Sequence, residues 1–429
     1  MRPSANFTPQ SNRADPLPPL TPAHDQPAPL SILKPHDDND RTDIKRHSVC
    51  NRVKVSRCLA PLRFMLPVID PPAAQTSAPP SDGGGRDWVP RRVLVTRSAA
   101  EHDHTHRILE RLQPHGIEVE YLKADRLPKL KTSDDRATYR TSKQTLAIVV
   151  APPSQFKLQP IPPSADYQFH LAQGCPAHCQ YCYLAGSLTG APIIRAYANL
   201  DDILDNLTNY AGDGHKTFEV SCYTDPLGVE AITGSLSRCI EWFGDHGPQH
   251  DISLRWVTKF DRVGPLIGLD HARATRCRFS LNADAATGKM EGGTASATNR
   301  LKAAARLASD GYPIGLVIAP IMPLDDQGGE RWRHEYGRLM DQITQHLGHV
   351  DDLNIELITH RFTPKSRDVL LSWYPKTKLD LSETNRQIKR NKFGGTKYVY
   401  HKTTMSQMKT WFEQTIADQL PRARILYWT

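Results

Sequence analysis

Short apolar runs alternate with longer amphipathic stretches along most of this 429-residue chain, from about residue 165 onward. The apolar runs are 217–221, 253–257, 277–281, 314–318 and 353–358, and the helical stretches between them include 200–210, 234–243, 297–309 and 331–347. Strands that alternate with helices form a parallel sheet wrapped by those helices. The chain is therefore predicted to have an α/β fold.

Two smaller regions flank this alternating region. Before it, strands at 92–96 and 117–122 enclose a helix at 99–112, and a basic connector at 123–143 leads to a further strand at 146–151. This pattern predicts a small α/β unit, and because it has no glycine-rich phosphate loop, we expect no nucleotide site in it. After the alternating region, a helix at 404–420 and a strand at 425–428 end the chain.

Residues 1–85 are rich in Pro, Ser, Asp and Arg and have no sustained apolar period. Such a segment cannot bury enough apolar surface to offset its ordering entropy, so we expect a disordered arm. Its one apolar patch, 62–69, is too short to span a membrane and lacks the flanks and cleavage site of a signal peptide. We therefore expect a cytoplasmic protein without a membrane partner, whose eight cysteines stay reduced.

Cys175, Cys179 and Cys182 form a C-x3-C-x2-C triplet on the loop after the first strand of the alternating region. Three thiolates are one short of the four that close a structural zinc site or a fully ligated iron–sulfur cluster. The triplet therefore suits a cluster with one open iron, which can chelate S-adenosylmethionine (SAM). A zinc knuckle with His178 or a distant residue as fourth ligand stays open as an interpretation, and a triplet also arises by chance.

The position of the triplet makes a partial (β/α)6 barrel the best architecture, with its chemistry at the carboxyl ends of the strands. Four regions are then expected. They are a disordered Pro-rich arm at 1–85, the small α/β unit at 86–150, the partial barrel at 151–380, and a C-terminal basic segment with a helix and a strand at 381–429.

The triplet, with Tyr181 and Tyr183 on either side of Cys182, resembles the signature of the radical-SAM superfamily. Other segments match in order over about residues 90–429, and together they resemble the spore photoproduct lyase family. These segments are 164–169, 220–226, 256–260, 278–281, 360–363 and 395–400. The arm at 1–85 has no counterpart in that family.

The resemblance implies a radical-SAM barrel and a DNA-repair lyase, which restores two thymines from the spore photoproduct, a methylene-bridged thymine pair made by ultraviolet light. It also implies a role for each matching residue. Cys175, Cys179 and Cys182 would hold a [4Fe–4S] cluster; Thr224, Lys259 and Ser280 would contact SAM; and Cys222 would return a hydrogen atom with the catalytic Tyr181 and Tyr183 near it. Each of these residues also has a simpler explanation. Cys222 would then be a small buried apolar side chain, and Lys259 would point into solvent. Ser280 would hydrogen-bond to the backbone, and the two tyrosines would only pack against their neighbours.

The implied chemistry proceeds by single electrons. An unidentified reductant would reduce the cluster, and SAM would yield a 5′-deoxyadenosyl radical that abstracts a hydrogen atom from the lesion. A thiol suits the return of hydrogen because its S–H bond is weak. Tyrosine O–H bonds are the next weakest, so the two tyrosines would relay a hydrogen atom and regenerate SAM.

A formal net charge of +8 favours a polyanionic partner such as DNA, although a diffuse excess is also common on solvated surfaces. Lys389, Arg390, Lys392, Lys397 and Lys402 cluster around Phe393, Tyr398 and Tyr400. Cations mixed with rings are typical of a nucleic-acid channel, so we take Arg361 and Lys397 as candidate contacts to DNA phosphates.

Two alternatives stay open at this point. A radical-SAM enzyme of the same family would act on another nucleic acid or a small molecule, because a fold does not fix a substrate. A zinc-stabilised nucleic-acid-binding protein would explain the triplet and the basic segment but not the matched SAM positions. Protein purified without oxygen would be brown in the first case and colourless in the second.

Overall fold

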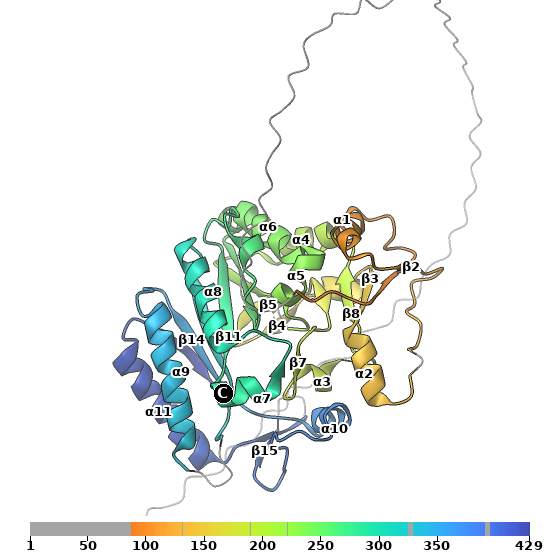
Figure 1. Ribbon diagram of the computed structural model, residues 1–429. Coiled ribbons are helices and arrows are strands. Elements are labelled where there is room, and N and C mark those ends of the chain that lie inside the picture. Colours follow the sequence, from red (N-terminus) through yellow and green to blue (C-terminus); the bar gives the residue numbers. More distant parts are fainter. Residues whose placement is uncertain (1–86, 131, 189, 221, 325–328, 391–394) are drawn as a thin grey trace, which may run out of the picture. The chain divides into compact units, whose positions relative to one another are not determined.

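Two main sheets organise the residues that the computed structural model describes, which are 87–429 apart from 131, 189, 221, 325–328 and 391–394 (Figure 1). The larger sheet has eight strands. Their order is β17 (Arg424–Trp428), β14 (Asn354–Thr359), β13 (Ile314–Ile321), β11 (Thr275–Leu281), β10 (Ile252–Thr258), β9 (Lys216–Glu219), β5 (Ala165–Gln168) and β4 (Gln159–Ile161). Every neighbouring pair is parallel except β4 with β5.

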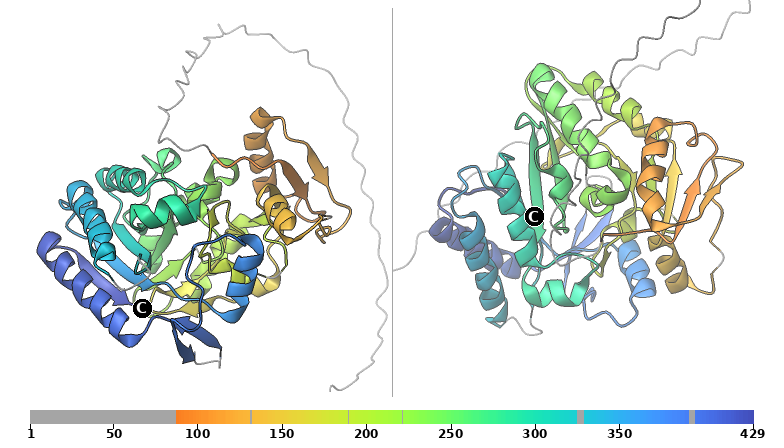
Figure 2. Two further views of the ribbon diagram at one scale, coloured as in Figure 1. Left: turned by 60° about the horizontal axis from the view of Figure 1, so that its bottom comes forward. Right: turned by 45° about the horizontal axis from the view of Figure 1, so that its top comes forward.

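The strands from β5 to β14 lie side by side in the order in which they follow along the chain. Helices connect most of them. These helices are α3 (Leu184–Ser187), α4 (Leu200–Asp205), α5 (Pro226–Thr233), α6 (Ser235–His250), α7 (Asp284–Met290), α8 (Ala297–Ser309) and α9 (Arg331–Leu347). The edge strands β4 and β17 do not pair with each other, so the described sheet curls without closing (Figure 2). The predicted partial (β/α)6 barrel is confirmed.

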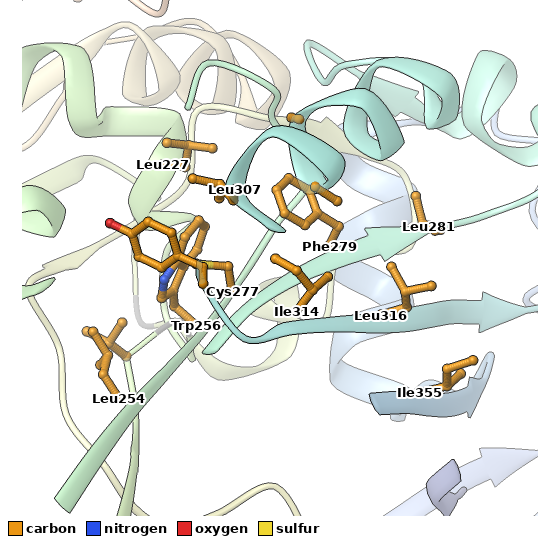
Figure 3. Close-up of a cluster of buried hydrophobic side chains, with 14 of the residues drawn as sticks. Leu227, Leu254, Trp256, Cys277, Phe279, Leu281, Leu307, Ile314, Leu316 and Ile355 are labelled. Carbon is orange, nitrogen blue, oxygen red and sulfur yellow. The ribbon is translucent and has the colours of Figure 1, made fainter. Parts of the chain in front are cut away.

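The face of the barrel strands that meets the helices is apolar. Successive side chains of a strand point to opposite faces, so alternate residues of β10 and β11 share this face. Trp256 and Phe279 are buried there with Leu307 of α8 in one hydrophobic cluster (Figure 3). Burial of each such side chain contributes about 1.5–3 kcal/mol, which fixes the helices on the sheet.

The opposite face of the same strands carries four buried charged side chains, Glu219, Arg255, Arg278 and Glu356, which we call the buried charge layer. Arg278 donates to both carboxylate oxygens of Glu356, at 3.0 and 2.9 Å, and also to Glu219. Arg255 donates to Glu356 as well. The two cations and two anions compensate each other, whereas one of them alone would cost several kcal/mol at such a depth.

Gly315 of β13 leaves the space that the Arg278 side chain of the buried charge layer occupies. A Cβ atom at this position would lie 2.8 Å from Cγ of Arg278, and the carboxylates of the layer hold that arginine in place. We expect Gly315→Ala to lower the free energy of unfolding by about 1–3 kcal/mol, because the arginine must leave its partners or the strands must separate. Denaturant unfolding followed by circular dichroism measures this loss.

Gly337→Ala is the matched control for this prediction. No atom lies within 4 Å of a Cβ at position 337, which is inside α9. An alanine in an open helical position should be neutral or stabilising by up to about 1 kcal/mol. Equal destabilisation by both substitutions would contradict the steric argument.

The smaller sheet contains the strands of the predicted N-terminal unit and extends beyond them. Its order is β2 (Val119–Tyr121), β1 (Arg92–Val95), β3 (Thr145–Val149), β8 (Ile194–Tyr197) and β6 (Ala172–Gln173), and α1 (Asp103–Leu112) precedes β2 along the chain. The last two strands come from beyond residue 150, so this sheet crosses the expected boundary. The domain boundaries stay predictions, and the expected disordered arm lies outside the described residues.

The prediction of a plain connector at 123–143 is wrong in its second half, which forms helix α2 (Asp135–Lys143). The Asp134 carboxylate accepts a hydrogen bond from the Ala137 N–H and caps this helix. The helix buries only Tyr139, Ser142 and Lys143, so its sequence shows little apolar periodicity.

The chain after β14 contains helix α11 (Lys402–Gln419), close to its predicted bounds, and elements that the sequence did not reveal. These are α10 (Pro364–Trp373) and a hairpin of β15 (Gln387–Arg390) and β16 (Thr396–Val399). Among the helices of the described residues, none is both long and apolar enough to cross a membrane.

Candidate functional site

The three residues predicted to contact SAM lie at the carboxyl ends of neighbouring barrel strands. Lys259 directly follows β10, Ser280 lies at the end of β11, and Thr224 lies in the loop after β9. Lys259 Nζ donates a 2.8 Å hydrogen bond to Ser280 Oγ. The structure therefore brings these two residues together, on the strand face that also carries the buried charge layer.

Asp225 joins the Thr224 loop to the Lys259 loop. Its carboxylate accepts 2.8 Å hydrogen bonds from Thr258 Oγ1 and from the Lys259 N–H, and it caps α5. Burial raises the pKa of Asp225 to about 6 against these hydrogen bonds. Asp225 was not among the predicted site residues, although an Asp followed by Pro is a helix-start signal that identifies its position.

Thr224 is buried, and its hydroxyl oxygen has no hydrogen-bond partner among the described residues. Buried hydroxyls are nearly always hydrogen-bonded in folded proteins. A buried hydroxyl without a described partner, on the loop that Asp225 ties to Lys259, fits a small polar ligand that would complete its hydrogen bonding.

Glu291 is a buried carboxylate that links several of the predicted site residues. Lys259 Nζ lies 3.0 Å from its Oε1, and the hydroxyl of Tyr181 donates to the same oxygen. The fully buried Arg300 pairs with its other oxygen, Oε2. Burial first, and Arg300 second, lower the pKa of Lys259 to about 7. Glu291 and Arg300 could not be predicted as site residues, because neither belongs to a recognisable motif.

The cysteine triplet lies on a loop that is fixed from two sides. Cys179 belongs to the short strand β7 (His178–Cys179), which pairs with β12 (Glu291–Gly292). The buried Lys143 of α2 donates to the carbonyl oxygens of Cys175 and Ala177, at 2.5 and 2.7 Å. All three cysteines of the triplet are free thiols, so they are available as metal ligands.

The zinc interpretation needs a fourth ligand, and one ring nitrogen of His178 already has another partner. Its Nδ1 lies 3.2 Å from the hydroxyl of Tyr139, whose ring stacks on Trp373. Within the described residues, no group of three or more His, Cys, Asp or Glu side chains converges closely enough to share one metal ion. An iron–sulfur cluster takes each thiolate on a different iron, so the three thiols of the triplet fit such a cluster without a fourth protein ligand.

Of the two tyrosines predicted near Cys222, only Tyr183 is hydrogen-bonded to it. The Tyr183 hydroxyl donates to the Cys222 carbonyl oxygen, whereas the Tyr181 hydroxyl donates to Glu291. The Cys222 thiol is partly buried, and burial raises its pKa to about 12. The thiol therefore keeps its hydrogen at neutral pH. The catalytic roles of these residues stay predictions.

The candidate phosphate contacts form a group of cations beside the β15–β16 hairpin. Lys389 and Lys397 are cross-strand neighbours, and Arg361 precedes the bridge between Phe362 and Tyr398. Burial, Arg361 and Lys389, in that order, lower the pKa of Lys397. In the part of the chain that the structure describes, none of these three cations forms a salt bridge, so a bound anion would relieve their repulsion.

The rings of the basic segment differ from the expected stacking surface. Tyr400 is buried under the guanidinium of Arg386, 3.7 Å from its ring centroid, so its ring is not available to a base. Tyr398 stacks on Phe362 and donates to Glu383. Lys392 and Phe393 lie outside the described residues.

Comparison with known proteins gives consistent matches over the described part of the chain. A family model for spore photoproduct lyase matches residues 88–429. The spore photoproduct lyase of Bacillus subtilis (strain 168) is 35% identical over 347 residues, which cover 80% of this chain and 99% of the relative. That of Geobacillus sp. (strain Y412MC61) is 36% identical over 352 residues, which cover 80% and 100%.

Solved structures match to the same extent. A spore photoproduct lyase complexed with dinucleoside spore photoproduct has a TM-score of 0.75 and 33% identity, with 80% of this chain and 100% of that chain covered. A variant of a spore photoproduct lyase with bound AdoMet and the same dinucleoside has a TM-score of 0.74 at the same identity and coverage.

Proposed function

The chain belongs to the spore photoproduct lyase family, and from this premise we propose that it is a radical-SAM carbon–carbon lyase that returns the spore photoproduct in DNA to two thymines. The proposal gives it a [4Fe–4S] cluster and SAM as cofactors. A related structure binds AdoMet together with the dinucleoside lesion, which supports both the cofactor and the substrate.

The observation that carries the proposal is the arrangement around Lys259. Its ammonium group contacts Ser280, and its backbone N–H is tied through Asp225 to the loop of the unpaired Thr224 hydroxyl. Through Glu291, the same lysine is connected to the strand that pairs with Cys179. We propose that Thr224, Lys259 and Ser280 bind SAM next to a cluster held by Cys175, Cys179 and Cys182.

The bound cluster and SAM would supply one-electron reduction and the abstraction of hydrogen from the lesion. Lys259 would pair with the carboxylate of SAM, for which Ser280 and Glu291 hold its ammonium group in position. Cys222 would donate the hydrogen atom that completes a thymine, and its protonated thiol supports this role. Tyr183 would pass a hydrogen atom to the cysteine from its position against the Cys222 carbonyl, with Tyr181 behind it.

We further propose that Arg361 and Lys397 bind phosphates of the DNA. Neither cation forms a salt bridge with a described residue, which supports this assignment, since phosphate contacts position a protein on its DNA. The electron would come from a one-electron reductant of the cytoplasm.

The test is turnover of the dinucleoside spore photoproduct by anaerobically reconstituted protein with SAM and dithionite. We expect thymidine to form only when SAM and the reductant are both present. Cleavage of SAM without thymidine would indicate that the enzyme acts on another substrate. A colourless protein that contains zinc and no iron would indicate a binding protein without this chemistry.

Lys259→Met should weaken the binding of SAM by at least about tenfold, because a charge-assisted hydrogen bond contributes about 1.5–3 kcal/mol. Equilibrium dialysis with the reconstituted, oxidised protein measures this affinity independently of turnover. Lys289→Met is the matched control, since this lysine is exposed on α7 and its only described hydrogen bond uses its backbone carbonyl. Unchanged SAM affinity in Lys259→Met would remove the lysine from the SAM site.

A further inference from the structure

A polar cavity of about 350 Å³ borders the loop that carries Cys222. Its wall includes Tyr223, the residue after Cys222, and Ser187, whose hydroxyl lies 3.4 Å from the Tyr183 carbonyl oxygen. The cavity therefore shares a wall with the proposed reaction site. Its volume lies in the range of small-ligand sites.

The cavity is positively charged. Lys157 and Arg195 line it, together with several glutamines, and no Asp or Glu is among its lining residues. In the described part of the chain Arg195 has one side-chain hydrogen bond, a 3.4 Å contact to Gln173, and neither cation forms a salt bridge. Two cations without a carboxylate in a polar cavity favour an anionic ligand.

His170 adds a buried ring to the wall of this cavity. Its side chain is 8% exposed, and its Nδ1 has no hydrogen-bond partner among the described residues. The ring lines the cavity and stands edge-on to Tyr223, with centroids 4.6 Å apart. Burial lowers the pKa of His170 to about 4, so the neutral ring has one donor and one acceptor nitrogen. A buried polar atom of this kind fits a ligand that carries hydrogen-bonding groups.

We propose that this cavity binds the deoxynucleotide next to the lesion in the same DNA strand. The inference rests on the proposed function, which places the lesion against Cys222. Lys157 and Arg195 would hold the phosphodiester that leaves the lesion. His170 and the glutamine amides would hydrogen-bond the adjoining base, and Tyr223 would offer it a ring face. The cavity would then favour a lesion within DNA over an isolated dinucleoside.

The experiment compares two substrates that differ only in the flanking nucleotides. One is the dinucleoside spore photoproduct, and the other is an oligonucleotide with the same lesion at its centre. The variant Lys157→Gln/Arg195→Gln should bind the oligonucleotide at least tenfold more weakly by fluorescence anisotropy, with a reduced salt dependence. Its kcat/KM for the dinucleoside should stay within about twofold of the unmodified protein.

Two control variants test whether weaker binding comes from the lost charge or from a disturbed fold. Arg136→Gln/Lys302→Gln removes two exposed cations outside the cavity and should leave both substrates unaffected. Lys157→Gln alone changes an exposed side chain, so it should weaken oligonucleotide binding in part without disturbing the fold. If unmodified protein turned over neither substrate, the proposed function would fail, and the anisotropy comparison would still decide whether the cavity binds the oligonucleotide.

Three results would overturn the inference. Oligonucleotide affinity unchanged in the double variant would show that the cavity holds no part of the DNA. An equal loss for both substrates would place the two cations at the lesion itself. Tight binding of free thymidine 5′-monophosphate by the unmodified protein, with no effect of the double variant on the oligonucleotide, would make this a site for free nucleotides.

Discussion

Cys179→Ala is expected to eliminate the iron–sulfur cluster and lower the rate of repair by at least about a thousandfold, or ~4 kcal/mol of barrier. The thiol lies on β7, which the pairing with β12 fixes in place, so a neighbouring side chain cannot take over its role. A cluster with two protein thiolates would be lost or left incomplete. Iron and sulfide analysis and visible absorbance of the anaerobically reconstituted protein measure the loss directly.

Cys239→Ala is the matched control for this experiment. Its thiol is fully buried in α6 among apolar side chains, so the substitution changes the same chemical group away from the site. Iron content and turnover should stay close to those of the unmodified protein, with a modest loss of stability. A Cys179→Ala protein with four irons and normal absorbance would show that the ligands are misassigned.

Cys222→Ala is expected to allow the lesion to open but to impair the hydrogen-atom return that completes the thymine. SAM would still be cleaved, because the proposed SAM contacts and cluster ligands are unchanged. The yield of thymine per SAM consumed should fall by at least about tenfold, and misreduced products should appear, because the nearest S–H donor is missing. Chromatography with mass spectrometry of the products from the dinucleoside measures this ratio.

Cys222→Ser distinguishes hydrogen-atom donation from hydrogen bonding at this position. Serine keeps the size and polarity of the side chain, but its O–H bond is much stronger than S–H. We expect the serine variant to give the same products as the alanine variant. A normal thymine yield from either variant would remove Cys222 from the donor role and leave Tyr183 as the candidate.

The order of strands and helices was predictable from the sequence because it depends on local apolar patterns. Helices α8 and α9 have the bounds that their spacing predicts. Helix α2 was missed because few of its side chains are buried, although its Asp134 cap is a sequence signal. The hairpin of β15 and β16 depends on pairing between exposed strands, which leaves a weak pattern.

The candidate site was predictable where residues follow strands and not where distant segments meet. The proximity of Lys259 and Ser280 was predictable, because β10 and β11 are parallel neighbours and their carboxyl ends must lie side by side. Glu291 reaches Tyr181 across 110 positions of sequence, through two short strands that no local pattern marks. Lys143 acts on the triplet loop from a helix that was itself missed.

The buried charge layer restricts which amino-acid substitutions this barrel can accept during evolution. Replacement of Glu356 alone would leave two buried arginines to share Glu219, and replacement of Arg278 alone would leave two buried carboxylates to share Arg255. We therefore expect substitutions in the buried charge layer to be tolerated only in compensating pairs. Gly315 is needed as long as position 278 is an arginine. Transfer of the carboxyl-terminal end of this barrel to another scaffold would therefore require all four residues of the buried charge layer.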